Sequence, residues 1–403
     1  MRSVLSIDVA NGKSEVLLIT EHGEVLIEPY EVNHCLNELN KLKDKINSFN
    51  LDDLTIFMES TSTYHLPIQR FFTNNNFKVQ VINPILGKNN TRNLRKTKTD
   101  IEDCYNLADL FFKNTVKIHT KEMNTIYSNM IELSRQEKHL TENIVRSKNR
   151  FKQIIANAFP EYIKCFTSNN IYGETSLNFI KEFPHADIIK AKRIDALANN
   201  IYKSAKGFLP YSRCLIKAKK IKEFANNSYP GIEVNSCEVN NLINIVDIII
   251  YNSNKLDEVK KDIINLAKQT PYFDIINSIY GIGETSTAQI IAELGDINRF
   301  ENIKQLNAFC GLDPTIIQSG KSINYNGPIS KRGNRNARKI LFITCCSIIR
   351  SSVLHNIDTD ILIYYRKKQT ENKHFKECIT ACSTKLLRII FAMCKNNSLY
   401  VQR

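Results

Sequence analysis

Four acidic residues in the first part of this chain have the types and spacing expected of a site for divalent cations. Asp8 and Glu59 each follow a short apolar run, as residues at the ends of buried strands do. Asp100 and Asp103 lie three residues apart, close to one helical turn, so both carboxylates share a face. Each carboxylate alone is more often a helix cap or a surface charge. Together they predict a site that binds two hard cations and cleaves or transfers phosphodiesters.

A second feature with possible chemistry is a basic stretch far downstream. Residues 314–350 include seven basic residues and no acidic one. Ser319 lies beside Gly320 in a segment, 318–321, that we expect to be a loop, and nearby cations would help bring its hydroxyl up to a phosphate. On spacing alone, such a segment is more often an ordinary polar turn. The basic residues are Lys321, Lys331, Arg332, Arg335, Arg338, Lys339 and Arg350.

The distribution of charge indicates the kind of partner. The chain of 403 residues carries a formal net charge of +14. Residues 1–110 contain 12 basic and 15 acidic side chains, whereas the remainder contains 43 basic and 26 acidic ones. A basic body joined to a mildly acidic part is typical of a metal-binding catalytic module on a protein that binds a polyanion. We favour nucleic acid as that partner over charges that are merely solvated.

Composition excludes several other classes. Hydrophobic residues make up 42% of the chain, enough for packed cores, and no apolar run has the ~18 residues of a membrane span. Eleven scattered cysteines and a start without a signal-peptide pattern predict free thiols in the cytoplasm. Cys378 and Cys382 lie four residues apart on an expected helix without a matching pair of ligands, which favours core packing over zinc.

Hydrophobic patterning predicts an α/β N-terminal domain at residues 1–115. The expected strands are 3–10, 14–20, 24–30, 54–58 and 77–82, and the expected helices are 35–49, 64–75 and one that starts near Asp100. This order, with an acid at the end of strands one and four, is that of the ribonuclease H-like fold. Lys96 and Lys98 belong to a basic, Asn-rich loop that could contact a phosphate backbone.

The middle of the chain, residues 116–268, reads as an all-α dimerisation region. Residues 116–160 and 240–268 have apolar side chains at helical and heptad spacing, so they could pair as an antiparallel coiled coil within one chain or between chains. Residues 161–239 are mixed in character and mainly helical.

Residues 269–403 form a third expected domain, which is mainly α. Gly281 and Gly283 precede a helix at 284–294, the pattern of a helix-hairpin-helix. Two glycines permit a tight turn that exposes amide groups to a phosphate oxygen. The alternative is a plain turn between helices. A dinucleotide-binding reading is poor because no strand precedes the glycines and the third glycine is missing.

Motifs in all three parts occur in the order of a known family. They are SIDV at 6–9, MEST at 58–61, VINP at 81–84, KTDIED at 98–103, GIG at 281–283, FCGLDP at 309–314, QSG at 318–320 and ISKRGN at 329–334. The chain resembles the insertion-sequence transposases with an Asp-Glu-Asp-Asp RuvC-like domain and a C-terminal serine domain, the bridge-RNA-guided recombinases, which are related to pilin-gene invertases. It departs from many relatives in lacking a second glycine after Gly320, and the middle region matches only in outline.

The resemblance implies roles for the candidate residues. Asp8, Glu59, Asp100 and Asp103 would bind two Mg²⁺ ions, which Mn²⁺ could replace, and Ser319 would be the nucleophile that forms a phosphoserine link to DNA. The resemblance also implies donor and target DNA, a non-coding guide RNA, and a homodimer or homotetramer as partners. Arg332, Arg335 and Arg338 could clamp the transition-state charge or only position phosphates. Two rival hypotheses remain: a metal-only nuclease of the Holliday-junction resolvase type, and a non-catalytic DNA-binding regulator.

Overall fold

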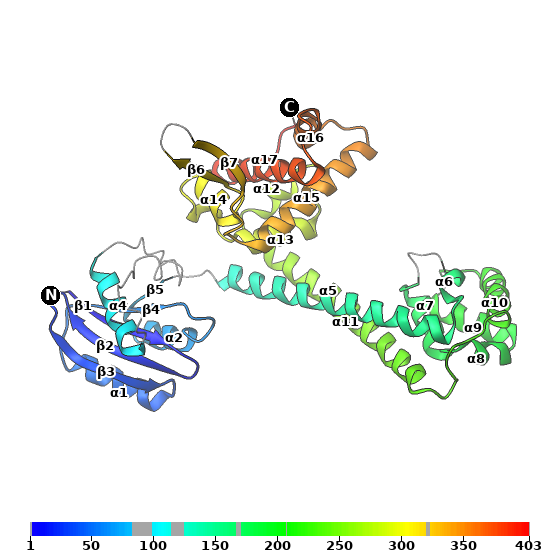
Figure 1. The fold of residues 1–403 in the computed structure, drawn as a ribbon, viewed down its shortest axis with the longest axis horizontal. Coiled ribbons are helices and arrows are strands. Elements are labelled where there is room, and N and C mark those ends of the chain that lie inside the picture. The colour runs from blue at the N-terminus through cyan, green and yellow to red at the C-terminus, as the bar shows by residue number, and fades with distance from the viewer. Residues whose placement is uncertain are drawn as a thin grey trace. The chain divides into compact units, whose positions relative to one another are not determined.

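The computed structural model describes residues 2–82, 99–113, 125–166, 171–206, 208–319 and 323–402. The chain divides into two units, residues 1–122 and residues 123–403, and each is described by itself (Figure 1). The predicted basic loop with Lys96 and Lys98, and also Lys321, lie outside the described residues.

The first unit is built on one mixed five-stranded sheet in the order β3-β2-β1-β4-β5. Its strands are β1 (Arg2–Val9), β2 (Lys13–Thr20), β3 (Val25–Asn33), β4 (Asp53–Glu59) and β5 (Lys78–Ile82). The first three strands are antiparallel neighbours, while β4 is parallel to β1 and β5 is parallel to β4. Gly12 and Gly23 have φ of 78° and 84° in the two hairpin turns, a conformation that glycine adopts without strain. The predicted α/β domain is thereby confirmed.

Among the described residues of this unit, three helices cover the two faces of the sheet. They are α1 (Leu36–Asn47), α2 (Leu66–Asn74) and α4 (Asp100–Phe112). One face buries Ile7 of β1 against Leu42 of α1 and Phe72 of α2. The opposite face buries Phe57 of β4 against Phe111 of α4. Alternating side chains of each strand serve the two cores, because successive residues of a strand point to opposite faces.

A long helix pair organises the second unit. Helices α5 (Thr125–Ala158) and α11 (Cys237–Ala267) pack along each other. Met130 of α5 shares a core with Val259 of α11, whereas Phe151, near the end of α5, shares another with Leu242, near the start of α11. The pair is therefore antiparallel and lies within one chain, one of the two arrangements that the sequence left open.

In the described part of the segment between α5 and α11, five helices share a core with that pair. They are α6 (Tyr162–Cys165), α7 (Glu174–Glu182), α8 (Ala186–Ala191), α9 (Ile194–Ser204) and α10 (Tyr211–Asn226). We call this group the helical insert. It occupies the residues whose pattern was least informative. Short helices with few apolar positions give weak periodicity, and they are stabilised here by the shared core rather than by their own propensity.

The C-terminal part shares a core with the end of the helix pair that contains Met130 and Val259. Its elements are α12 (Phe273–Asn277), α13 (Glu284–Leu294), η1 (Ile297–Arg299), α14 (Ile303–Cys310), β6 (Pro314–Ser319), β7 (Ile323–Ile329), α15 (Arg335–Leu354), α16 (Asp360–Thr370) and α17 (Phe375–Asn396). Cys345, Cys378 and Cys382 are buried in or beside this core. Among the described helices, none is both long enough and apolar enough to cross a membrane.

Candidate functional site

The sheet of the first unit places two of the predicted acids side by side. In the parallel β1–β4 pair Ile7 lies opposite Met58, so Asp8 and Glu59 are the next residues of adjacent strands. Asp8 points to the same face as Val4, four residues earlier, and Glu59 points to the same face as Phe57. Both acids thus end neighbouring strands on the face that α4 covers, and both are half-buried.

Helix α4 brings the other two acids to this face. The Thr99 hydroxyl caps its first turn by accepting a 3.2 Å hydrogen bond from the Glu102 amide, and Asp100 and Asp103 lie in that turn. The Cys104 thiol donates to the carbonyl oxygen of Glu15 on β2 at 3.3 Å. This contact fixes the acidic first turn of α4 over the centre of the sheet.

Electrostatic effects show which carboxylates are close together. The pKa of the Cys104 thiol is raised to about 12, chiefly by burial and also by the charges of Asp8, Glu15 and Asp103, while a backbone hydrogen bond at Asp8 lowers it. Burial also raises the pKa of Glu15, with additional contributions from Asp100 and Glu31. Carboxylates from β1, β2 and both positions on α4 therefore act on one small region.

Sequence reasoning missed Glu15 and Glu31 as members of this acidic face. Glu15 lies directly opposite Asp8 in the antiparallel β1–β2 register, and Glu31 lies opposite Glu15. Glu31 is paired with Lys13 at 2.6 Å. The tight turn at Asn11-Gly12 would have given the register of the hairpin, and hence the position of Glu15 across from Asp8.

The predicted metal ligands share a face but are not drawn into a closed set. Within the described ranges, no three His, Cys, Asp or Glu side chains are grouped so that they could hold a metal ion. The available donors are all carboxylate oxygens, which suit Mg²⁺.

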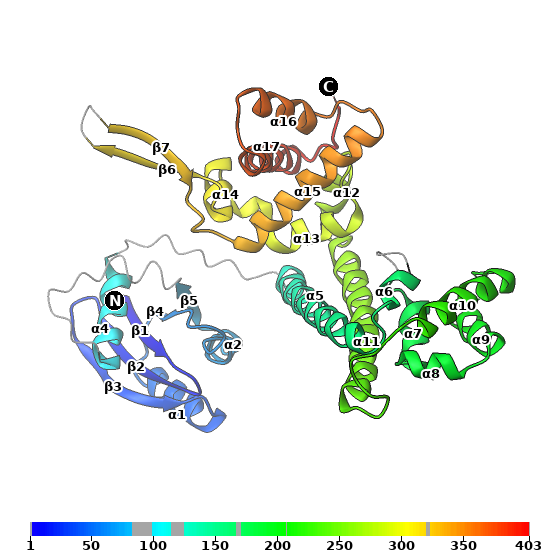
Figure 2. The same ribbon diagram turned by 45° about the vertical axis from the view of Figure 1, so that its right-hand side comes forward.

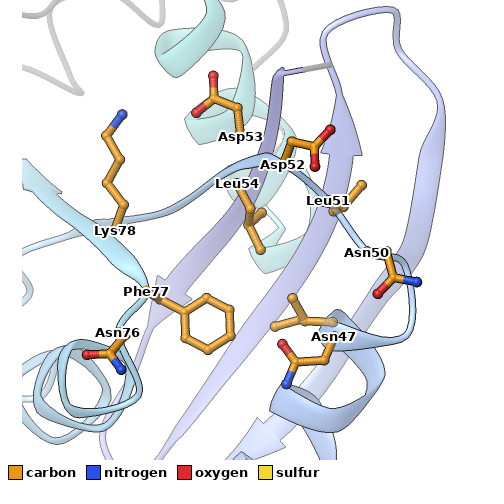
Figure 3. Close-up of a pocket in the computed structure, with 10 residues that line it drawn as sticks. Asn47, Asn50, Leu51, Asp52, Asp53, Leu54, Asn76, Phe77 and Lys78 are labelled. Carbon is orange, nitrogen blue, oxygen red and sulfur yellow. The ribbon is translucent and has the colours of Figure 1, made fainter.

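A hollow of about 660 Å³ lies at the other end of the same sheet (Figure 3). Asp53, Lys78 and Phe77 line it, at and just before the starts of β4 and β5. Because Glu59 ends β4 and Asp53 begins it, this hollow is separate from the acidic face. We assign it no part in the chemistry.

Ser319 is the last residue of β6 and pairs with Ile323, the first residue of β7. The prediction that residues 318 and 319 form a loop was therefore wrong, because both belong to a strand of an antiparallel hairpin. The β-branched run Thr315, Ile316 and Ile317 favours that strand. At the base of the hairpin the Ser330 hydroxyl donates to a carboxylate oxygen of Asp313 at 2.7 Å.

The segment that follows the hairpin is held by Arg338 of α15. Its guanidinium donates to the carbonyl oxygens of Cys310 at 2.7 Å, Gly333 at 3.2 Å and Lys331 at 3.2 Å. These contacts join the segment to the end of α14. The Arg338 side chain is thus occupied by hydrogen bonds to backbone carbonyls of the protein. The side chains of four other basic residues are exposed, namely Lys331, Arg332, Arg335 and Lys339.

A buried acid, Glu293 on α13, lies beneath the same segment. Its carboxylate accepts hydrogen bonds from Arg135 of α5, from the Ser134 hydroxyl at 2.8 Å and from the Asn334 side chain at 2.9 Å. Burial by itself would raise the pKa of Glu293, but these hydrogen bonds and the positive charge of Arg135 together lower it. Sequence analysis did not single out Glu293, because nothing in the local pattern of an apolar helix marks a buried acid.

The two predicted phosphate-binding glycines form the turn between α12 and α13. Gly281 has φ of 82°, and a Cβ there would lie 2.9 Å from the backbone of Ile348. Gly283 is exposed and precedes the first turn of α13. That turn carries Glu284, which pairs with Lys268 at 2.9 Å. An acid therefore lies at the helix end where we expected a phosphate.

The region with the four acids and the region with Ser319 each match a known protein family. Residues 5–160 match a transposase model named for the DEDD transposases of IS110, and residues 273–356 match the transposase IS116/IS110/IS902 family. All four predicted acids fall in the first match, and Ser319 falls in the second. The chain thus contains two segments that are similar to transposase domains. More specifically, both segments resemble domains of IS110-family transposases.

Individual relatives are distant. An uncharacterized protein of insertion element IS110 from Streptomyces coelicolor is 23% identical over 138 residues, 34% of this chain and 32% of the relative. A pilin gene-inverting protein from Moraxella bovis is 26% identical over 163 residues, 39% of this chain and 48% of the relative. The transposase of IS1111A from Coxiella burnetii is 28% identical over 145 residues, 36% of this chain and 39% of the relative. The matched stretches thus span less than half of each relative.

Proposed function

We propose that this protein is the transposase of an insertion sequence, an enzyme that cuts and rejoins DNA strands. The observation that carries the proposal is the location of the five candidate catalytic residues. All five fall within the two matched transposase domains, four on one face of the first domain's sheet and one on a hairpin of the second. The names of the Moraxella and Coxiella relatives, an inverting protein and a transposase, support DNA as the substrate.

In this proposal the first domain is RuvC-like and its acids bind Mg²⁺. The sheet order β3-β2-β1-β4-β5, with Asp8 and Glu59 ending β1 and β4, supports the assignment. Asp100 and Asp103 would complete the ligand set from α4. Bound cations would neutralise charge on the scissile phosphate. The negative charges of Asp8, Glu15 and Asp103 all act on the Cys104 thiol, and this concentration of negative charge supplies a physical reason for the region to bind cations.

Ser319 would attack the scissile phosphorus with its hydroxyl oxygen. The bond from phosphorus to the leaving DNA oxygen breaks as the phosphoserine bond forms, and the hydroxyl proton leaves with solvent. A second DNA end can then displace the serine, so the number of phosphodiester bonds is conserved and no ATP is needed. A position at the end of β6, the strand's end away from α14, supports a role in reaching a substrate.

Two partners complete the proposal. Exchange of strands needs at least two active sites, so we propose a homodimer or a homotetramer. The family resemblance further suggests a non-coding RNA that selects the target by base pairing, and the basic second unit is compatible with it. A helix-hairpin-helix contact through Gly283 would add a phosphate site, although Glu284 weakens that reading.

The decisive experiment looks for the covalent intermediate. The full chain is incubated with Mg²⁺ and a plasmid that carries the DNA flanking its gene, then denatured and digested for mass spectrometry. We expect a nucleotide adduct on Ser319, which is lost in Ser319→Ala and kept in the neighbouring control Ser322→Ala. If Ser319→Ala cleaves the DNA as well as the parent does, the protein is a metal-only nuclease. If neither the parent nor either variant cleaves the DNA but all three bind it, the protein is a DNA-binding regulator.

A further inference from the structure

The helical insert lies outside both family matches, which end at residue 160 and resume at residue 273. It therefore has features that the transposase domains do not explain. Residues 186–226, which form α8, α9 and α10, contain ten basic and three acidic side chains. That excess concentrates much of the chain's positive charge on one small bundle.

Three aromatic side chains lie exposed where α9 passes into α10. Phe208, in the connection, is 89% exposed. Tyr202 at the end of α9 and Tyr211 at the start of α10 meet edge to face, with ring centroids 5.7 Å apart, and both are about two-fifths exposed. Helices α9 and α10 pack side by side (Figure 2). Because Tyr202 lies near the end of α9 and Tyr211 starts α10, their contact lies at the end of the pair where the connection joins the two helices.

Two basic residues close in sequence to these aromatic residues have no partner in the described part of the chain. Lys203 and Arg213 are exposed and make no ion pair or side-chain hydrogen bond within the described part of the chain. Their basic neighbours differ: Arg193 pairs with Asp195 at 3.0 Å, and Lys206 pairs with Glu174 at 2.5 Å. Lys203 and Arg213 therefore keep their full charge toward solvent.

We define the aromatic–basic tip as Tyr202, Lys203, Phe208, Tyr211 and Arg213. Phe208 is almost fully exposed and the two tyrosine rings are partly exposed, while the two cations have no acidic partner among the described residues. This combination suits a flexible strand of nucleic acid. Each unpaired base can stack on an aromatic ring, while the cations contact the phosphates between bases. A duplex offers its phosphates to the cations but keeps its bases stacked inside.

We propose that the aromatic–basic tip binds single-stranded nucleic acid. This activity is separate from strand cleavage and requires neither the acids of the first unit nor Ser319. It gives the protein a way to hold an unpaired segment of RNA or DNA at a surface that the matched transposase domains lack. A comparison of single-stranded RNA with single-stranded DNA in the same assay decides which of them the tip binds.

The test measures binding of the full chain without divalent cations, so that cleavage plays no part. Fluorescence anisotropy follows labelled single-stranded RNA and DNA of roughly 20 nucleotides, and a duplex of the same length. Loss of one stacking ring is expected to weaken single-strand binding about tenfold in Phe208→Ala. Tyr251→Ala is the matched control, because Tyr251 is an exposed aromatic on α11, away from the tip.

A second pair of variants tests the charges. Lys203→Ala combined with Arg213→Ala removes two cations at the tip, and Lys260→Ala combined with Lys261→Ala removes two from α11. The tip variant should reduce the slope of log affinity against log salt by about 1.4 for single strands, and the control should not. Thermal melting verifies that each variant is folded.

Distinct results support or overturn the proposal. A loss in Phe208→Ala with single-stranded RNA, DNA or both supports it and identifies the strand. Unchanged affinity for both strands overturns it, as does an equal loss with the duplex, which would indicate a general phosphate surface. A change in oligomeric state by light scattering, without a change in affinity, would overturn it too, because the exposed rings would then contact a second copy of the chain.

Discussion

The side-chain nitrogen of Asn334 donates to the carboxylate of Glu293 at 2.9 Å, while the side-chain oxygen of the same asparagine caps α15. One residue thus ties a buried acid of α13 to the first turn of the helix that follows the serine hairpin. Arg135 and Ser134 of α5 complete the set of donors around the acid. The position of the hairpin's base is therefore coupled to the long helix pair.

Removal of Glu293 should destabilise the second unit more than any surface acid does. Glu293→Ala leaves Arg135 and Asn334 without their shared acceptor, and breaking a buried pair in this way costs about 3 kcal/mol. Glu132→Ala is a suitable control, since Glu132 is exposed on α5 and should change the unfolding free energy by less than about 0.5 kcal/mol. Chemical denaturation measures both. Equal effects of the two variants would show that the network contributes little.

The same acid predicts a dependence of stability on pH. The folded-state pKa of Glu293 lies below its ordinary value because the hydrogen bonds and the Arg135 charge outweigh burial. Because its pKa is lower in the folded state, ionised Glu293 contributes to the unfolding free energy. This contribution is complete above the unfolded-state pKa, about 4.3, and is lost as the pH falls through the folded-state pKa. Melting temperatures between neutral and acidic pH should fall more steeply for the parent than for Glu293→Gln. Parallel curves would contradict the assignment.

Gly333 should tolerate no side chain. A Cβ at this position would lie 2.1 Å from the carbonyl oxygen of Phe309 and 2.5 Å from the backbone nitrogen of Gly311. Because those atoms belong to the backbone of α14 and its cap, Gly333→Ala should lower the unfolding free energy by about 1–3 kcal/mol. Gly283→Ala meets nothing within 4 Å at an ordinary φ and serves as the control. Thermal melting that ranks the two alike would refute this reading.

Substitution of Arg338 should affect stability, whereas substitution of Arg335 should affect DNA binding. Arg338 donates to three backbone carbonyls, so Arg338→Ala should lower the melting temperature. Arg335 is exposed in the first turn of α15, so Arg335→Ala should leave the melting temperature unchanged and weaken DNA binding. One lost phosphate contact would reduce the salt slope of duplex binding by about 0.9. A stable Arg338→Ala variant with reduced DNA affinity would instead favour a direct DNA contact by Arg338.

Much of the first domain could be predicted from the sequence, for reasons visible in particular residues. Runs such as Ile56, Phe57 and Met58 are buried on both faces and read as strands without ambiguity. Asp8 and Glu59 were placed at strand ends because each interrupts such a run. Glu15 was missed because its relation to Asp8 depends on hairpin register, which a strand-by-strand reading does not supply.

The second unit shows the limit of local patterns. Ser319 was assigned to a loop because Gly320 follows it, yet pairing with Ile323 extends β6 to its end. Glu293 and Arg135 are 158 residues apart, so no local rule could connect them. The predicted domain boundaries at residues 115 and 268 remain a prediction. Helices α5 and α11 do pair within one chain, which is one of the two arrangements that we expected.

The last prediction concerns cations at the acidic face. If Asp8, Glu59, Asp100 and Asp103 bind Mg²⁺, millimolar Mg²⁺ should stabilise the first domain, by about 1.4 kcal/mol at ten times the dissociation constant. Asp8→Asn should lose this response. Asp52→Asn, at the hollow on the other end of the sheet, is the control. Differential scanning fluorimetry with and without Mg²⁺ separates these effects, and an equal Mg²⁺ response in Asp8→Asn and Asp52→Asn would remove Asp8 from the ligand set.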